Sequence, residues 1–132
     1  MDAINNILIN SLRKNAIPPN FFDKKYIEEN SNDQFSSINH DVFVIYNNGY
    51  KLEISYYKNQ SKLHYVSFEK LDDHFQDLFF NNQIDKVNEN LKMTTNKTLH
   101  VDKDYGLGNF KFIFDDGLLE SIFYQPDEVN KL

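Results

Sequence analysis

The 132-residue chain contains no cysteine and no tryptophan, and only four glycines and three prolines. The absence of cysteine excludes disulfide bonds, thiolate metal sites and cysteine nucleophiles. No apolar run approaches the roughly 18 residues of a membrane-spanning helix. The first residues carry neither the basic region nor the apolar stretch of a secretory signal. We therefore expect a cytoplasmic protein without a membrane segment.

Aromatic side chains supply much of the apolar surface that this sequence can bury. Twelve Phe and eight Tyr make up 15% of the residues, within an apolar fraction of 40%. A chain this rich in rings is unlike a disordered one, and its length suits one domain. Such a domain buries roughly two-thirds of its unfolded surface. We expect a single folded domain over residues 1–132.

The net charge of −6 is unevenly distributed. Residues 1–68 hold 7 acidic and 7 basic side chains, whereas residues 69–132 hold 13 acidic and 7 basic ones. An acidic surface repels phosphate backbones, which argues against nucleic-acid binding. It attracts a basic partner protein and speeds association with it. The simpler interpretation, an acidic surface that only keeps the protein soluble, stays open.

The first half of the sequence predicts one helix and three strands. Apolar residues recur at helical spacing from Ile4 to Leu12, with Asp2 as the expected N-cap, and Pro18-Pro19 ends the helix. Residues 20–40 are expected to be a loop with one helical turn near 23–29. Strands are expected at 42–46, 50–57 and 63–68, where β-branched and aromatic residues alternate with polar ones. Asn48-Gly49 favours a tight hairpin between the first two.

The second half predicts a helical segment followed by a hairpin. Phe68, Leu71, Phe75, Leu78 and Phe79 recur at helical spacing, and Ile84, Val87 and Leu91 restart the period after a kink. Residues 96–107 are expected to be a loop with a short strand at 99–101. Strands at 110–114 and 118–124 flank the turn signal Asp115-Asp116-Gly117. The predicted class is α+β, with an antiparallel sheet of about five strands, in the order α-β-β-β-α-(α)-β-β.

The last hairpin is apolar on both faces. Phe112, Phe114, Leu118 and Ile122 are expected on one face, and Ile113, Leu119 and Phe123 on the other. A sheet that is apolar on both sides needs cover on both sides. The two helices supply it if they lie on opposite faces of the sheet. If they share one face, the other must meet a second subunit or another protein.

No motif of catalysis or metal binding is complete in this sequence. The four histidines have no zinc-ligand spacing. The segment starting at Asp102 departs from a calcium loop because its glycine is one place early and Ile113 stands where Glu is required. Gly106-Leu107-Gly108 lacks the third glycine and the following helix of a dinucleotide loop. We expect a protein without cofactor or metal that is not an enzyme, although a site built from dispersed His and carboxylates stays an alternative.

These features resemble bacterial immunity proteins of interbacterial competition, which are small, acidic, cysteine-free α+β domains rich in aromatics. The resemblance implies binding to a cognate toxin domain, with carboxylates that complement its basic active site. An acidic helix face could bind that active site by imitating nucleic acid. The alternative is that this face is only a solvated surface. From the charge distribution, the expected contacts are Asp72, Asp73, Asp77, Asp115, Asp116 and Glu120.

The order of elements is also similar to that of class I type III secretion chaperones. That resemblance implies a homodimer that binds an effector protein. Those chaperones close with a helix, whereas here only residues 125–132 follow the last predicted strand. The sequence thus predicts a protein-binding module, with a toxin-like basic partner first and a homodimer second.

Overall fold

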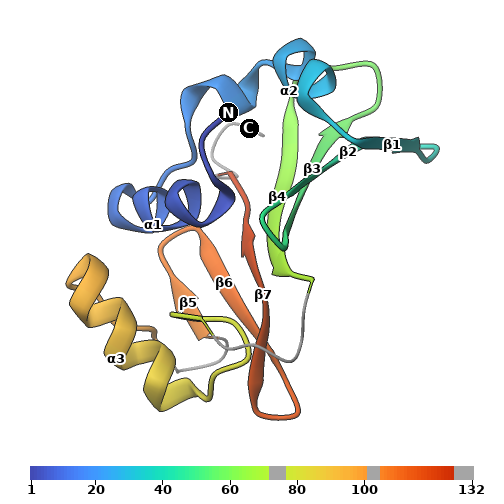
Figure 1. Ribbon diagram of the computed structural model, residues 1–132. Coiled ribbons are helices and arrows are strands. Elements are labelled where there is room, and N and C mark those ends of the chain that lie inside the picture. Colours follow the sequence, from blue (N-terminus) through green and yellow to red (C-terminus); the bar gives the residue numbers. More distant parts are fainter. Residues whose placement is uncertain (72–76, 101–104, 127–132) are drawn as a thin grey trace.

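The computed structural model describes residues 1–71, 77–100 and 105–126 (Figure 1). Seven strands form one antiparallel sheet in the order β1-β2-β3-β4-β7-β6-β5, accompanied by helices. The α+β prediction is confirmed, with seven strands in place of about five. The elements are α1 (Ile4–Lys14), η1 (Pro19–Phe22, a 3-10 turn), α2 (Lys24–Asn30), β1 (Asp33–Ser36), β2 (His40–Asn47), β3 (Tyr50–Tyr57), β4 (Leu63–Lys70), α3 (Ile84–Thr95), β5 (Tyr105–Leu107), β6 (Phe110–Asp115) and β7 (Leu118–Tyr124).

Helix α1 forms where the apolar period predicts it. Ile4, Leu8 and Leu12 are buried along one side, at the spacing that brings side chains to the same face. The N-cap is Ala3, which provides no side-chain hydrogen bond, so the prediction of Asp2 at this position was wrong. Asn15 ends the helix in the left-handed conformation.

The core lies between the helices and one face of the sheet. Leu52, Ile54 and Tyr56 point to this face from β3 and are fully buried. They join one apolar cluster with α1 and α3, and full burial of each such side chain contributes about 1.5–3 kcal/mol. Helices α1 and α3 contact each other on this side of the sheet (Figure 1), and Ile27 of α2 packs into the same cluster. Among the described residues, no helix lies on the opposite face, which we call the helix-free face.

A β-bulge in β4 changes which side chains reach the core. Ser55 pairs with Tyr65 and Tyr56 pairs with Leu63, so His64 is the extra residue on its strand. Leu63 therefore turns toward the core, where it is buried. Strict alternation along this predicted strand would put Leu63 on the same face as Tyr65, and the bulge breaks that alternation.

The helix expected from Phe68 to Phe79 is not present at either of its ends. Phe68 lies within β4, where it is buried opposite Leu52. Residues 77–82 form bends and turns, and α3 begins at Ile84. Residues 72–76 lie outside the described residues. Phe68 and Phe79 both reach the core, the first from a strand and the second from a turn, so their helical spacing is coincidental.

The C-terminal hairpin forms as expected, but a register shift between Ile113 and Phe114 redistributes its apolar residues. Phe112 and Ile122 are paired and buried in the core. Leu119 is also fully buried, contrary to the expected alternation. Ile113 and Phe123 lie on the helix-free face and are partly exposed. Helices α1 and α3 therefore share one side of the sheet. The helix-free face is covered by its own side chains alone.

Three further elements differ from the expectation. β1 pairs with β2 although all four of its side chains are exposed. β5 adds the other edge strand beside β6, and His100 forms an isolated bridge with Gly106 where a strand at 99–101 was expected. The helical turn near 23–29 is a helix, α2, whose N-cap Asp23 accepts hydrogen bonds from the backbone N–H groups of Lys25 and Tyr26.

The C-terminal ends of α1 and α3 stabilise each other. Arg13 of α1 donates from Nε to the carbonyl of Thr94, 2.7 Å away in the last turn of α3. Lys97, just after α3, donates to the carbonyls of Leu12 and Arg13 at 3.0 and 2.9 Å. Each cation thus satisfies carbonyls that the other helix leaves without intrahelical partners.

Candidate functional site

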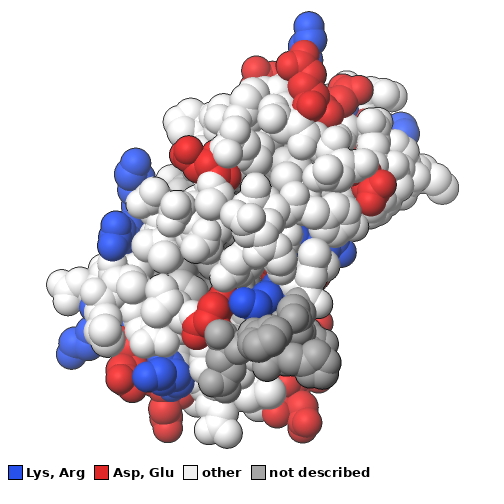
Figure 2. Space-filling model, in the orientation of Figure 1, with Lys and Arg blue, Asp and Glu red and all other residues white. Residues whose placement is uncertain are grey.

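Four carboxylates surround one hollow at the end of the sheet. Asp115, Asp116 and Glu120 of the predicted set line it together with Glu69. Its volume is about 420 Å³. We call it the acidic groove; it is lined by Glu69, Lys70, Phe80, Asn81, Asp115, Asp116, Leu118, Leu119 and Glu120. Figure 2 shows acidic side chains at the lower end of the molecule, where Figure 1 places the turn between β6 and β7.

The turn chemistry of the last hairpin places two of these carboxylates. Asp116 and Gly117 both have positive φ, 53° and 80°, as the tightest hairpin turns require. Asp115 and Asp116 are therefore held at the tip of the hairpin, and both are exposed. Lys70 is the single basic residue of the lining, and its Nζ lies 5.1 Å from the centre of the Tyr50 ring. The acidic groove thus carries an excess of negative charge.

Asp77 has inward contacts rather than a place in the groove. Its Oδ1 accepts hydrogen bonds from the backbone N–H groups of Phe79 and Phe80, both at 2.7 Å. Its Oδ2 accepts one from the Tyr50 hydroxyl at 2.6 Å. Burial and this carboxylate raise the pKa of Tyr50 above its usual value. Asp77 therefore shapes the turn that brings Phe79 and Phe80 into the core.

The other two predicted contacts, Asp72 and Asp73, lie outside the described residues. The structure therefore brings together three of the six predicted residues, Asp115, Asp116 and Glu120, and adds Glu69. Figure 2 shows acidic and basic side chains interspersed over the rest of that view. Within the described part of the chain, carboxylates thus gather at the acidic groove.

A row of aromatic rings in contact with one another crosses the helix-free face. His40, Tyr57, His64, Tyr65 and Phe123 come from β2, β3, β4 and β7, and we call them the aromatic row. The His40 and His64 rings stack with centres 4.1 Å apart. Tyr57 lies 5.0 Å from His64, which lies 5.1 Å from Tyr65, and Tyr65 lies 5.3 Å from Phe123. All five side chains are partly exposed.

Small residues beneath the rings let them lie across the sheet. Ser55, Ser67 and Ser121 are buried on this face in three adjacent strands. The Ser55 hydroxyl is 3.3 Å from Nδ1 of His64. The Ser67 hydroxyl, by contrast, is buried without a hydrogen-bond partner among the described residues. The rings therefore serve as cover for this face in place of helices.

Carboxylates accompany the rings. Tyr65 donates its hydroxyl proton to Oε2 of Glu53 at 2.6 Å. Burial, and then the bond to Glu53, raise the pKa of Tyr65 above its usual value, so it stays a neutral donor. Nζ of Lys51 lies 3.9 Å from Oε1 of Glu53 and 3.8 Å from Oε2 of Glu69. Glu69 also lines the acidic groove, so the two surfaces are contiguous.

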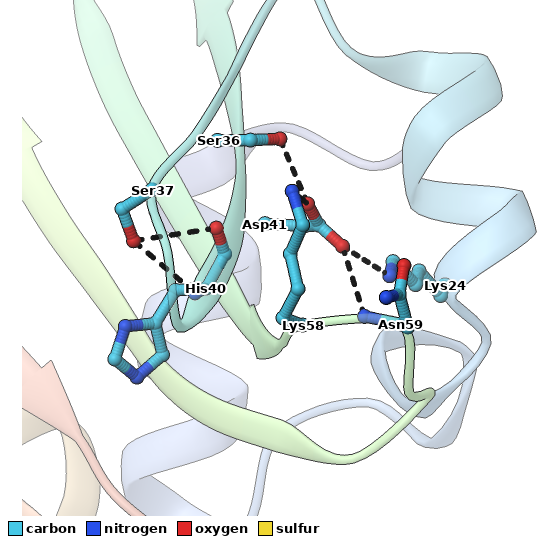
Figure 3. A network of polar contacts seen from close by, with 7 residues as sticks. All are labelled: Lys24, Ser36, Ser37, His40, Asp41, Lys58 and Asn59. Carbon is cyan, nitrogen blue, oxygen red and sulfur yellow. Dashed lines mark hydrogen bonds and ion pairs between the residues drawn. The ribbon is translucent and has the colours of Figure 1, made fainter.

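A separate polar network fixes the other end of the sheet (Figure 3). Asp41 accepts hydrogen bonds from Lys24 and Ser36, each at 2.8 Å, and from Lys58 at 3.2 Å. The hydrogen bonds from Lys24, Ser36 and Lys58, in that order of effect, hold the pKa of Asp41 well below its usual range. The bonds join α2, β1 and the turn after β3, which indicates a structural role. Beside it, the Ser37 hydroxyl accepts from the His40 N–H at 3.1 Å and so fixes the residue that begins the aromatic row.

Sequence reasoning missed the aromatic row because its members come from four strands. The clustering depends on strand pairing and on the bulge that places His64 beside Tyr65. In the sequence, the rings of His64 and Tyr65 are recognisable only as neighbours within one predicted strand. Glu69 was missed because it was assigned to the beginning of a helix rather than to β4.

Comparisons with family models, with curated proteins and with solved structures gave no match for this chain. Within the described ranges, no group of three or more His, Asp or Glu side chains is arranged to hold a metal ion. None of the helices formed by those residues is long and apolar enough to cross a membrane. The acidic groove and the aromatic row are therefore the features on which a function can be argued.

Proposed function

We propose that this protein is a non-enzymatic binding module that neutralises a basic partner protein by covering its functional surface, as an immunity protein does for a toxin domain. The observation that carries the proposal is the acidic groove, where Glu69, Asp115, Asp116 and Glu120 meet a single lysine. Carboxylates gathered at one end of a molecule attract a basic surface over distance and orient it on approach.

The arrangement of the sheet supports binding over catalysis. The polar groups with strong internal partners, such as Asp77 and Asp41, serve turns and the junction of elements rather than a cavity. The groove opens at the end of a hairpin, and its carboxylates come from β4, β6, β7 and the turn between β6 and β7. Three of these carboxylates lie on hydrogen-bonded strands, which hold them in place before binding. Such preorganisation favours tight association because little order is lost on binding.

The first experiment identifies what co-purifies with the untagged protein from its native cell, by mass spectrometry. A stoichiometric basic protein then becomes the ligand for rate measurements. Neutralising the groove by Asp115→Asn, Asp116→Asn and Glu120→Gln should slow association on the order of tenfold at low salt. The salt dependence of the rate should flatten, because fewer charges remain to be screened.

A matched variant removes the same number of charges elsewhere. Glu28→Gln, Glu29→Gln and Asp85→Asn change exposed residues of α2 and α3. Asn is suited to the positive φ of residue 116, so the groove variant should keep its turn. Equal slowing by both triple variants would show that net charge matters and the groove does not, and would reject the proposed surface.

A homodimer that binds an effector, as in secretion chaperones, is the second candidate. The helix-free face favours it, because a face without helices is a common place for a second subunit. The net charge of −6 opposes it, because like-charged copies repel each other. Light scattering at micromolar concentration tests this candidate directly, because a monomer would reject the homodimer and a dimer would support it.

A further inference from the structure

The turn between β2 and β3 brings an asparagine side chain next to an unengaged backbone nitrogen. Asn48 and Gly49 form the tip of this hairpin, because Asn47 and Tyr50 pair on either side of them. Both tip residues are exposed and have positive φ, 49° and 82°. Within the described part of the chain, neither the Asn48 side chain nor the Gly49 N–H forms a hydrogen bond. Both groups are therefore available for reaction with each other.

The reaction open to this pair is closure of a five-membered ring. The backbone nitrogen of Gly49 loses its proton to hydroxide and attacks Cγ of Asn48. The bond from Cγ to Nδ2 then breaks, and Nδ2 takes a proton from water and leaves as ammonia. Water opens the cyclic imide in a second step. Breaking the new bond to Cγ gives aspartate, and breaking the bond to the main-chain carbonyl carbon gives isoaspartate.

We propose that Asn48-Gly49 is a site of spontaneous deamidation, at which the protein acquires a carboxylate at the tip of this hairpin. Gly49 favours the reaction because it has no Cβ to crowd the attacking nitrogen. The surroundings are open as well, since a Cβ built on Gly49 would have no atom within 4 Å. Water and hydroxide are the only co-reactants, so the site works without an enzyme.

Asn59 provides a matched comparison within the same molecule. It is also exposed and has a positive φ, 59°. The next residue is Gln60, whose side chain crowds the nitrogen that would attack. The Gln60 N–H also donates to the carbonyl of Tyr57 at 3.0 Å, and ring closure would have to break this bond first. We therefore expect Asn48 to react well before Asn59.

The new carboxylate would lie near the acidic groove. The Gly49 carbonyl accepts a hydrogen bond from the N–H of Leu71 at 2.8 Å, and Leu71 directly follows Lys70 of the groove lining. Deamidation therefore adds one negative charge to the net −6 at this end of the sheet. The modification needs no partner protein, so it stands or fails separately from the proposed function.

The test follows the full-length protein during incubation in neutral and in mildly alkaline buffer. Tandem mass spectrometry of proteolytic peptides locates each replacement of NH2 by OH, and an isoaspartyl methyltransferase measures isoaspartate. Residue 48 should react at least about tenfold faster than Asn59, which corresponds to a barrier lower by about 1.4 kcal/mol. The reaction should be faster in alkaline buffer, because the attacking nitrogen must lose its proton. Isoaspartate should form together with aspartate.

Asn48→Gln keeps a side-chain amide but would have to close a six-membered ring. Formation of isoaspartate should fall about tenfold or more in this variant. Equal rates at residues 48 and 59 in the unaltered protein would overturn the proposal, and so would an unmodified residue 48. Aspartate at residue 48 without isoaspartate would mean direct hydrolysis and would also overturn it. Peptide mapping of the unaltered protein keeps the test valid if the variant fails to fold.

Discussion

Replacing Asp41 by Asn should make the free energy of unfolding of this protein less dependent on pH in the acid range. The carboxylate accepts bonds from Lys24, Ser36, Lys58 and the backbone N–H of Asn59. The substitution would keep the size of the side chain and remove the charge that both lysines face. Since the pair with Lys24 has little exposure, its charge-assisted bond is worth about 1.5–3 kcal/mol. The Lys58 pair is over a third exposed on the lysine side, so its share is about 0–1 kcal/mol.

We therefore expect Asp41→Asn to lower the free energy of unfolding by about 2 kcal/mol at pH 7. The sign of the pH dependence follows from the lowered pKa of Asp41 in the folded protein. The stabilisation is fully present above the unfolded pKa of about 3.9. It is lost as the pH falls below that value toward the folded pKa, because the unfolded state takes up the proton first.

Urea unfolding followed by circular dichroism at a series of pH values measures this difference. The gap between the unaltered protein and Asp41→Asn should be constant from pH 7 to about pH 5 and should shrink below about pH 4. The control is Asp116→Asn, the same chemical change at an exposed turn residue that Asn tolerates. A gap that stayed constant throughout the acid range would refute the assignment of the stabilisation to the charge of Asp41.

Three further substitutions test the turns and the packing of the sheet. Gly108→Ala should cost about 1–3 kcal/mol, because residue 108 has a φ of 59° and an added Cβ would meet the side chain of Asn15. Gly117→Ala, with a φ of 80° and open space, should cost less, and equal melting temperatures for the two variants would show that the contact with Asn15 is unimportant. Ser67→Ala removes a buried hydroxyl that has no partner in the described structure, so we expect unchanged or slightly raised stability in urea. A loss above about 1 kcal/mol would mean that this hydroxyl is hydrogen-bonded in solution.

The elements that could be predicted from the sequence are those whose signals are local. Asn48-Gly49 and Asp116-Gly117 specify tight turns because all four residues have positive φ. The apolar period from Ile4 to Leu12 needs no knowledge of the rest of the chain. β1 escaped prediction because its exposed side chains carry no burial pattern, and it is held by pairing of its main chain with β2.

The candidate site was only partly predictable for the same reason. Asp115 and Asp116 were found because a turn signal and two charges coincide in adjacent residues. Glu69 escaped because helical spacing from Phe68 onward competed with the strand and was misleading. The aromatic row depends on the pairing of β4 with β7, which are far apart in the chain, and on a bulge of one residue. Neither can be read from a local pattern.

The position of β7 has a consequence for synthesis of the protein. β7 lies between β4 and β6, and its Tyr124 pairs with Val66, which is made much earlier. Until β7 emerges from the ribosome, β4 is therefore an open edge beside an apolar core face. Unpaired edges of this kind recruit other strands and lead to aggregation. Chains that terminate before Leu118 should thus be clients of chaperones rather than stable fragments, and the β1–β4 meander should not accumulate alone.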